Sequence, residues 1–192
     1  MSHIIQDVPE WEVNQFFSIC STIGAYIVFP SRRIDGKPTI NGARGLHHKI
    51  RDRFDLTLEC IRRHYGGQVS PLSETLARYA DFFALFGNFE GYADYFLLKD
   101  LVSKDGTSVS FFIPFRDFDG SPLPGNVYEY RSYKDSLVSF VIARNDRMAR
   151  MAVLGEQIAW NRVDSGYQPP AQSPPTRSTS APSSASFSSS RS

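Results

Sequence analysis

The sequence predicts an α+β fold that is predominantly helical and has a small sheet of two or three strands. Through most of the chain, apolar side chains recur at intervals of three and four residues, which is typical of helices that bury one face. Two short runs, IGAYIVF at residues 23–29 and VSFFIPF at residues 109–115, are instead continuously apolar and rich in β-branched and aromatic residues. We therefore expect helices that cover one small sheet.

The first third of the chain predicts one helix, one strand and two turns. Pro9, followed by Glu10 and Glu12, is typical of a helix start, and this helix continues to Cys20. The apolar run at residues 23–29 reads as a buried strand closed by Pro30. Asp-Gly within residues 32–38 predicts a turn, and a hairpin tip before a short return strand at residues 39–40 is one form that it can take. NGARG at residues 41–45 predicts a second turn.

A central helix is expected over residues 50–65. Its apolar face repeats in steps of four, four, three and four, with the members Ile50, Phe54, Leu58, Ile61 and Tyr65. Charges of both signs occupy its other faces. Spacing allows Arg51 to meet Asp55, and it allows Glu59 to meet Arg62 or Arg63. We expect an ion-paired surface, some of whose charges are partly buried.

The rest of the chain predicts three more helices and one strand. Ser70 as N-cap and Pro71 at the first position indicate a helix to residue 86. Residues 90–102 fit either a helix or a strand, and we assign a helix. Residues 109–115 form the second strand, residues 116–125 a loop, and a helix from Val127 continues to Met151 or to Trp160.

Length and composition predict a single globular domain over residues 1–163 and a disordered Ser/Pro-rich tail over residues 164–192. The formal net charge is +1, of which Arg177 and Arg191 in the tail supply two positive charges, so the domain carries −1 and is not a general polyanion binder. No apolar run reaches the ~20 residues that span a bilayer, and no signal peptide is apparent. With Cys20 and Cys60 read as reduced thiols, we expect a cytoplasmic protein without membrane contact.

Several strings of the chain resemble an uncharacterised bacterial domain family of unknown function. They include TINGARG at residues 39–45, DRFDLTLECIRRHY at residues 52–65, FLLKDLV at residues 96–102, FFIPF at residues 111–115 and ARN at residues 143–145. The resemblance covers roughly residues 19–148 and implies no assigned reaction. Family members carry a longer segment ahead of the Ile-Gly strand, so the resemblance also implies an N-terminally shortened chain.

The leading functional hypothesis is a site for a phosphate, a nucleotide or a nucleic acid on the basic turn and central helix. Between Arg32 and Arg53 there are seven Lys or Arg residues and two Asp residues, and a Gly-rich turn before a helix presents N–H groups to anions. NGARG matches neither a Walker loop nor GxGxxG, so the motif itself is weak. The candidate ligand-binding residues are Asn41, Arg44, Lys49, Arg53 and Arg63, with Asp52 and Glu59 orienting the arginines.

Other chemistry has less support in the sequence. A metal or acid–base site from His47, His48 and His64 with Asp52, Asp55 and Glu59 lacks a recognisable ligand motif. A ribonuclease pair from Arg53 and His64 has the wrong spacing, and neither cysteine has a recognisable His partner. We expect no metal and no cofactor, and the sequence does not decide whether the protein is an enzyme. The alternative hypothesis is a protein-interaction module without catalytic activity.

Overall fold

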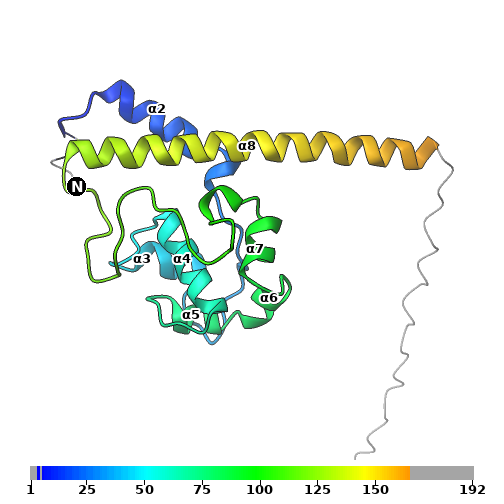
Figure 1. The fold of residues 1–192 in the computed structure, drawn as a ribbon, viewed down its shortest axis with the longest axis horizontal. Helices are drawn as coiled ribbons and strands as arrows, with labels where there is room; N and C mark the ends of the chain where they lie inside the picture. The colour runs from blue at the N-terminus through cyan, green and yellow to red at the C-terminus, as the bar shows by residue number, and fades with distance from the viewer. Residues whose placement is uncertain (1–3, 5, 165–192) are drawn as a thin grey trace, which may run out of the picture. The chain divides into compact units, whose positions relative to one another are not determined.

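The structure is a computed structural model that describes residues 4 and 6–164, with side chains up to Gly155, and this part of the chain is all-helical (Figure 1). Its α-helices are α2 (Glu10–Cys20), α3 (Ile40–Leu46), α4 (Phe54–Tyr65), α5 (Ser73–Ala77), α6 (Ala80–Ala84), α7 (Phe89–Tyr95) and α8 (Val127–Asp164). Two 3-10 helices, η1 (Ile23–Ala25) and η2 (Lys99–Leu101), complete the elements. Within the described residues there is no β-strand, and strand-like pairing is confined to one antiparallel bridge between Val102 and Val109. The expected α+β class is therefore wrong.

Residues 4 and 6–155 belong to one compact unit, and the last turns of α8, from residue 156 to residue 164, belong to a second one. The predicted disordered tail lies outside the described residues, apart from its first residue, Asp164, which ends α8. The division between a domain and a tail therefore stays a prediction. Among the described residues, none of the helices combines the length and the apolar character needed to cross a bilayer.

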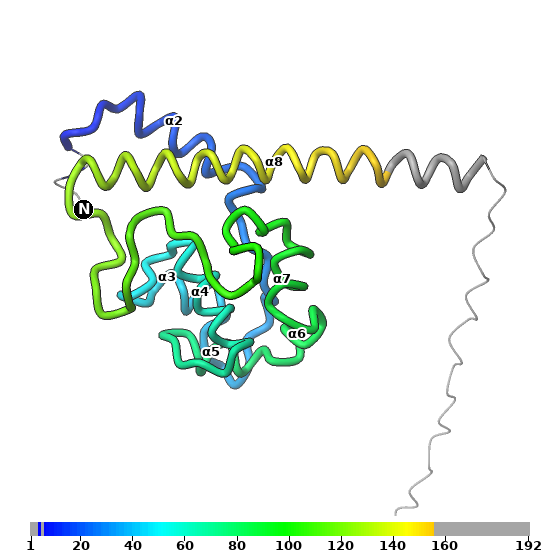
Figure 2. The backbone as a smooth tube through the Cα atoms, viewed as in Figure 1, coloured from blue at the N-terminus to red at the C-terminus, as the bar shows by residue number. Residues whose placement is uncertain are grey.

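Helix α4 lies among α3, α5 and α7 (Figure 2). Every residue from position 53 to position 61 is buried, including Arg53, Asp55 and Glu59. The helix contacts α5 and α7, and Phe54 packs edge to face against Phe140 of α8 with 5.1 Å between ring centroids. The sequence therefore located the central helix, but α4 is contacted on its polar faces as well as on its apolar stripe.

Helix α2 runs beside the first half of α8, and the two helices point in the same direction (Figure 1). Phe16 contacts Tyr130 with 6.3 Å between ring centroids, and Glu12 accepts hydrogen bonds from Arg131 and Lys134. Just after α2, the Gly24 N–H donates to Asn145 Oδ1 at 2.7 Å. A Cβ at Gly24 would lie 2.7 Å from the Val141 carbonyl oxygen, so this close approach to α8 requires glycine.

The expected strand at residues 23–29 is wrong. It consists of η1 and then an extended segment, residues 26–33, that has no partner strand within the described residues. The carbonyl groups of Gly24 and Tyr26 accept hydrogen bonds from Arg144 Nη1 of α8, each at 2.8 Å. A buried side chain therefore satisfies backbone groups that a neighbouring strand would satisfy in a sheet.

The expected strand at residues 109–115 is also wrong, for the same physical reason. The Phe112 N–H donates to Asp55 Oδ2 at 3.0 Å, and Arg53 Nη1 donates to the Pro122 carbonyl oxygen at 2.8 Å. Charged side chains of α4 thus hold the irregular chain between η2 and α8. Phe112 and Phe118 bury their rings in the core from this irregular segment.

Several expected helix boundaries also change. NGARG is not a turn but lies in α3, which Thr39 caps by accepting a hydrogen bond from the Gly42 N–H. Helix α4 begins at Phe54 rather than Ile50, because a turn with positive φ at Arg51 and Asp52 precedes it. The helix expected to residue 86 is split into α5 and α6, and the helix expected over residues 90–102 ends at Tyr95. The helix after Pro9 is confirmed, and α8 continues past both expected ends.

Candidate functional site

Arg44, the first predicted phosphate ligand, is engaged inside the chain. Its Nη1 lies 2.7 Å from Asp52 Oδ1, its Nη2 donates to the Asp52 carbonyl oxygen, and its Nε donates to Thr57 Oγ1. Burial lowers the pKa of Arg44, and the charge of Asp52 opposes that shift. Asp52 does orient Arg44 as expected, but the guanidinium joins α3 to the start of α4 instead of facing solvent.

Arg53 forms a buried ion pair with Asp55. Arg53 Nε donates to Asp55 Oδ1 at 3.0 Å, its Nη2 donates to Oδ2, and the two side chains are 4% and 0% exposed. Asp55 also accepts hydrogen bonds from the N–H groups of Leu56 and Phe112. Since each polar atom of the pair has a partner in the protein, the pair acts as an internal brace.

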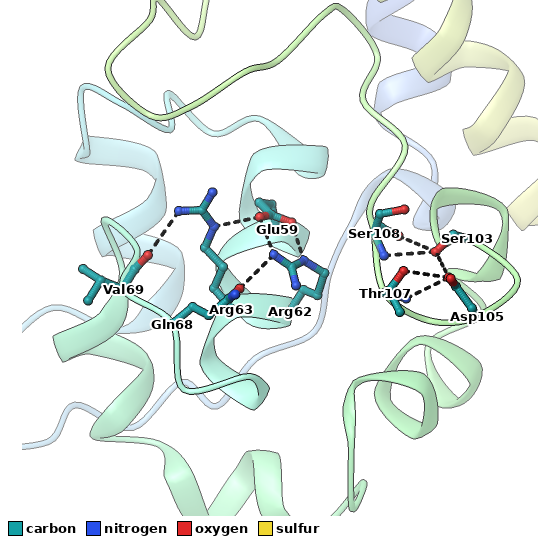
Figure 3. A network of polar contacts seen from close by, with 9 residues as sticks. All are labelled: Glu59, Arg62, Arg63, Gln68, Val69, Ser103, Asp105, Thr107 and Ser108. Atoms are coloured by element: carbon teal, nitrogen blue, oxygen red, sulfur yellow. Dashed lines mark hydrogen bonds and ion pairs between the residues drawn. The ribbon is translucent and has the colours of Figure 1, made fainter.

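Glu59 is the acceptor for two arginines one turn further along α4 (Figure 3). Arg62 reaches both of its oxygens, at 2.8 and 2.9 Å, and Arg63 Nε donates to Oε1 at 2.7 Å. The pKa of Glu59 is lowered because these hydrogen bonds together outweigh the effect of burial. Arg63 also lies over the ring of Phe118, 4.8 Å from its centroid. The predicted pairing of Glu59 with Arg62 and Arg63 is therefore confirmed.

The remaining predicted ligands do not join the arginines in one cavity. Asn41 lies exposed on α3, and Lys49 pairs at 2.8 Å with Asp119, whose side chain is 88% exposed. Two hollows lie away from these residues. One, of 330 Å³, is lined by residues of η2, of the segment at 110–112 and of α8, and the other, of 230 Å³, lies between α7 and residues 99–104. Neither is lined by a predicted ligand residue.

Within the described residues, the histidines and cysteines do not assemble a reactive centre. His47 stacks on His48 with 5.0 Å between ring centroids, and burial followed by the charges of His48 and Lys49 lowers its pKa. His64 packs on Phe83 at the opposite end of α4 from Arg53. Burial raises the pKa of the Cys60 thiol to about 12. Among the described residues there is also no group of three or more His, Cys, Asp or Glu that could hold a metal ion.

The sequence did not single out Arg144, because an arginine on a long predicted helix gives no sign of the backbone groups that it will reach. Arg144 is 1% exposed, and its guanidinium binds the carbonyl oxygens of Gly24, Tyr26 and Phe96. Burial lowers its pKa to about 10. No carboxylate within the described residues pairs with it, so carbonyl dipoles stabilise the charge. Arg144 thereby joins α8 to two separate segments.

Exposed apolar side chains lie next to the segments that Arg144 joins. Ile23, Tyr26, Val28 and Tyr95 are each more than half exposed, between 57% and 71%, and all lie within a few residues of the carbonyl groups that Arg144 binds. We call these four residues the Tyr26 surface. The sequence reasoning missed it because residues 23–29 were assigned to a buried strand, in which Tyr26 and Val28 would be covered. Residues 23–29 are continuously apolar, so no pattern in the sequence separates the exposed side chains from the buried ones, and the alternation of exposure is visible only in the structure.

Comparison with known proteins adds a family but no activity. A search of the curated proteins and a search of the solved structures each found no match. The family described as "Family of unknown function (DUF6994)" matches residues 1–148, which include α2 to α7, the Tyr26 surface and Arg144. The chain therefore belongs to DUF6994, a family of unknown function.

Proposed function

We propose that this protein is an interaction module that contacts a protein partner through the Tyr26 surface. The observation that carries the proposal is the exposure of four large apolar side chains, Ile23, Tyr26, Val28 and Tyr95, beside a rigid junction held by Arg144. Single exposed apolar residues are ordinary, but four of them within two residues of the groups that Arg144 binds favour an interaction site. Two of the four are tyrosines, a residue type enriched at interface hot spots.

The rigidity of the junction supports the same function. Arg144 binds three carbonyl groups, Asn145 binds Gly24 and Thr22, and Gly24 packs directly on α8. A surface that is already ordered loses little conformational entropy when it binds, so more of the contact energy appears as affinity.

A phosphate, nucleotide or nucleic-acid ligand is less well supported. Arg44, Arg53 and Arg63 each have a carboxylate partner, respectively Asp52, Asp55 and Glu59. A phosphate would have to displace these pairs, and displacing the buried one leaves an uncompensated carboxylate in the interior.

Site-specific photo-crosslinking tests the proposal. A photoreactive phenylalanine analogue placed at Tyr95 in the full chain is expected to crosslink to a discrete protein in cells of the source organism. Tyr128 provides the matched control, because it is 82% exposed but lies at the start of α8, away from residues 23–28 in the chain and from Arg144. Equal crosslinking at both positions, or none at Tyr95, would contradict the proposal.

A second experiment addresses the rival ligand class. Titration of the full chain with a fluorescent single-stranded oligonucleotide at low salt is expected to give no saturable binding. Saturable binding that disappears in Arg44→Ala and weakens with salt would favour the phosphate hypothesis instead.

A further inference from the structure

We infer that the partner binds by strand addition, laying an extended, acidic segment along residues 26–33. This inference rests on the proposed function and specifies how the Tyr26 surface is used. In strand addition, the backbone of one protein pairs with an open backbone edge of another, while side-chain pockets and flanking charges select the sequence.

The backbone is extended at Tyr26 and unpaired at residues 27–29, whereas the carbonyl groups of Tyr26 and Arg32 at its two ends accept hydrogen bonds from Arg144 and from the Tyr79 hydroxyl. Tyr26 has φ −105° and ψ 140°, and the residues after it adopt no helix or turn up to position 33. Within the described residues, the N–H groups of Ile27, Val28 and Phe29 find no acceptor, and the carbonyl groups of the same three residues find no donor. Backbone groups in this state are a template for pairing with another chain.

The side chains alternate as they do along a strand. Ile27 and Phe29 are buried in the core, whereas Tyr26 and Val28 are 57% and 64% exposed. The composition of residues 23–29 is that of a strand, yet this part of the chain supplies no second strand to pair with. A strand that a partner provides would satisfy both the sequence pattern and the open backbone.

Charge next to the segment indicates an acidic partner. Arg32 and Arg33 follow it directly, both are exposed, and neither has an ion pair within the described residues. Asp35 and Lys37 offset each other just beyond, so the local excess is positive. Opposite charges facing each other across paired strands stabilise the pairing, and like charges destabilise it.

The charges of Arg32 and Arg33 also disfavour two other occupants, the end of this chain and a second copy of it. Beyond Asp164 the chain has no acidic residue and contains Arg177 and Arg191, so its own end does not complement Arg32 and Arg33. A second copy would bring an identical segment and therefore the same two arginines.

A synthetic peptide of alternating valine and threonine with glutamates at one end is the probe. We expect it to bind the full chain in fluorescence anisotropy. Successive N–H groups of an extended chain point to opposite edges, and Arg144 occupies the edge of the Tyr26 carbonyl group. We therefore expect the amides of Ile27 and Phe29, on the other edge, to exchange with deuterium at least tenfold more slowly in the presence of the peptide. The same peptide with lysine in place of glutamate is expected to bind at least tenfold more weakly.

Two substitutions at one position separate backbone pairing from side-chain contact. Ser31→Pro removes an N–H donor on the same edge as Ile27 and Phe29, and because Ser31 is exposed and its N–H has no acceptor within the described residues, the fold should be kept. It is expected to weaken peptide binding roughly tenfold. Ser31→Thr keeps the N–H and the hydroxyl group and should change binding by less than about threefold. Circular dichroism and melting temperature establish that both variants fold.

Each possible result either overturns or supports strand addition by an acidic partner. Equal binding by both variants, or binding without protection of the Ile27 and Phe29 amides, overturns strand addition even if Tyr95 crosslinks to a protein. Protection of these two amides without peptide, together with dimerisation in sedimentation, would assign the segment to a second copy and overturn the acidic partner. Peptide binding with protection of these amides, and its loss in Ser31→Pro, supports the inference.

Discussion

Helix α4 and the extended segment at residues 26–33 use their polar groups in opposite ways. The charges of α4 look available in the sequence, yet Arg53, Asp55 and Glu59 are buried and paired inside the protein. The backbone of the extended segment looks like part of a sheet, yet Ile27, Val28 and Phe29 have no backbone partner in the described residues. The charges of α4, which suggested a ligand site, therefore stabilise the fold. Residues 27–29, which suggested a buried strand, have backbone groups that are free within the described residues.

This contrast changes the interpretation of the strings that carry the family resemblance. In DRFDLTLECIRRHY, Arg53 and Asp55 hold residues 112 and 122, and Glu59 binds Arg62 and Arg63. Such side chains stabilise irregular chain that cannot form its own ladders of hydrogen bonds. The functional hypothesis therefore moves from the charges to the surface beside Arg144.

The largest expected effect comes from breaking the buried pair of α4. Asp55→Ala should lower the free energy of unfolding by about 3–5 kcal/mol, because it leaves Arg53 buried without a carboxylate. Asp119→Ala, at the 88% exposed partner of Lys49, should cost less than about 1 kcal/mol. Urea denaturation measures both. If the two variants lose equal stability, the interior brace assigned to α4 is wrong.

A smaller loss is expected where α8 holds the extended segment. Arg144→Lys keeps the charge but cannot present a planar fork to the carbonyl groups of Gly24, Tyr26 and Phe96, so we expect a loss of roughly 2–3 kcal/mol in the same assay. Arg150→Lys, at an exposed position six residues later on α8, is the control and should be neutral. Equal stability of the two variants would show that Arg144 does not anchor the segment.

Alanine substitutions at Gly24 and at Gly155 are expected to change stability in opposite directions. Gly24→Ala places a methyl group 2.7 Å from both the Val141 carbonyl oxygen and Asn145 Oδ1, and should cost roughly 1–2 kcal/mol. Gly155→Ala meets no atom within 4 Å inside α8 and should stabilise the protein by up to about 1 kcal/mol. Thermal unfolding should therefore shift downward for the first and upward for the second. If Gly24→Ala leaves the melting temperature unchanged, the claim that Gly24 packs tightly on α8 is wrong.

The smallest expected effect is a pH dependence at the contact between α2 and α8. Hydrogen bonds from Lys134 and then Arg131 lower the pKa of Glu12 below its ordinary value of 4.5. Because the folded pKa is the lower one, this stabilisation is present above pH 4.5 and is lost as the pH falls through the folded pKa. Glu12→Gln should flatten stability against pH in that acidic range, whereas exposed Glu10→Gln should not. Parallel profiles for wild type and Glu12→Gln would contradict the assignment.

How much of this molecule the sequence could predict depends on whether the relevant contact is local. Helices α2, α4 and α8 follow from apolar spacing, and the Glu59 pairs follow from positions three and four apart on α4. Asp55 pairs with Arg53 rather than Arg51, because Arg51 has a positive φ and lies outside the helix. The helix boundary, not the charge spacing, decides that partner.

The strands failed because pairing is a property of two distant segments. Residues 23–29 and 109–115 each carry a strand pattern, but Arg144 and Asp55 bind their backbone groups from helices far away in the sequence. Spacing along the chain cannot reveal which carbonyl a buried guanidinium will reach. For the same reason the sequence suggested a ligand site at Arg44 and Arg53, whose partners became visible only in the fold.

Native-state hydrogen exchange on the free, full-length protein tests the central contrast most directly. The account predicts that the amides of Ile27, Val28 and Phe29 exchange quickly, while those of Leu58, Cys60 and Ile61 in α4 exchange only when the whole unit unfolds. Slow exchange at residues 27–29 in a monomer, equal to that of α4, would contradict the claim that this backbone edge is open.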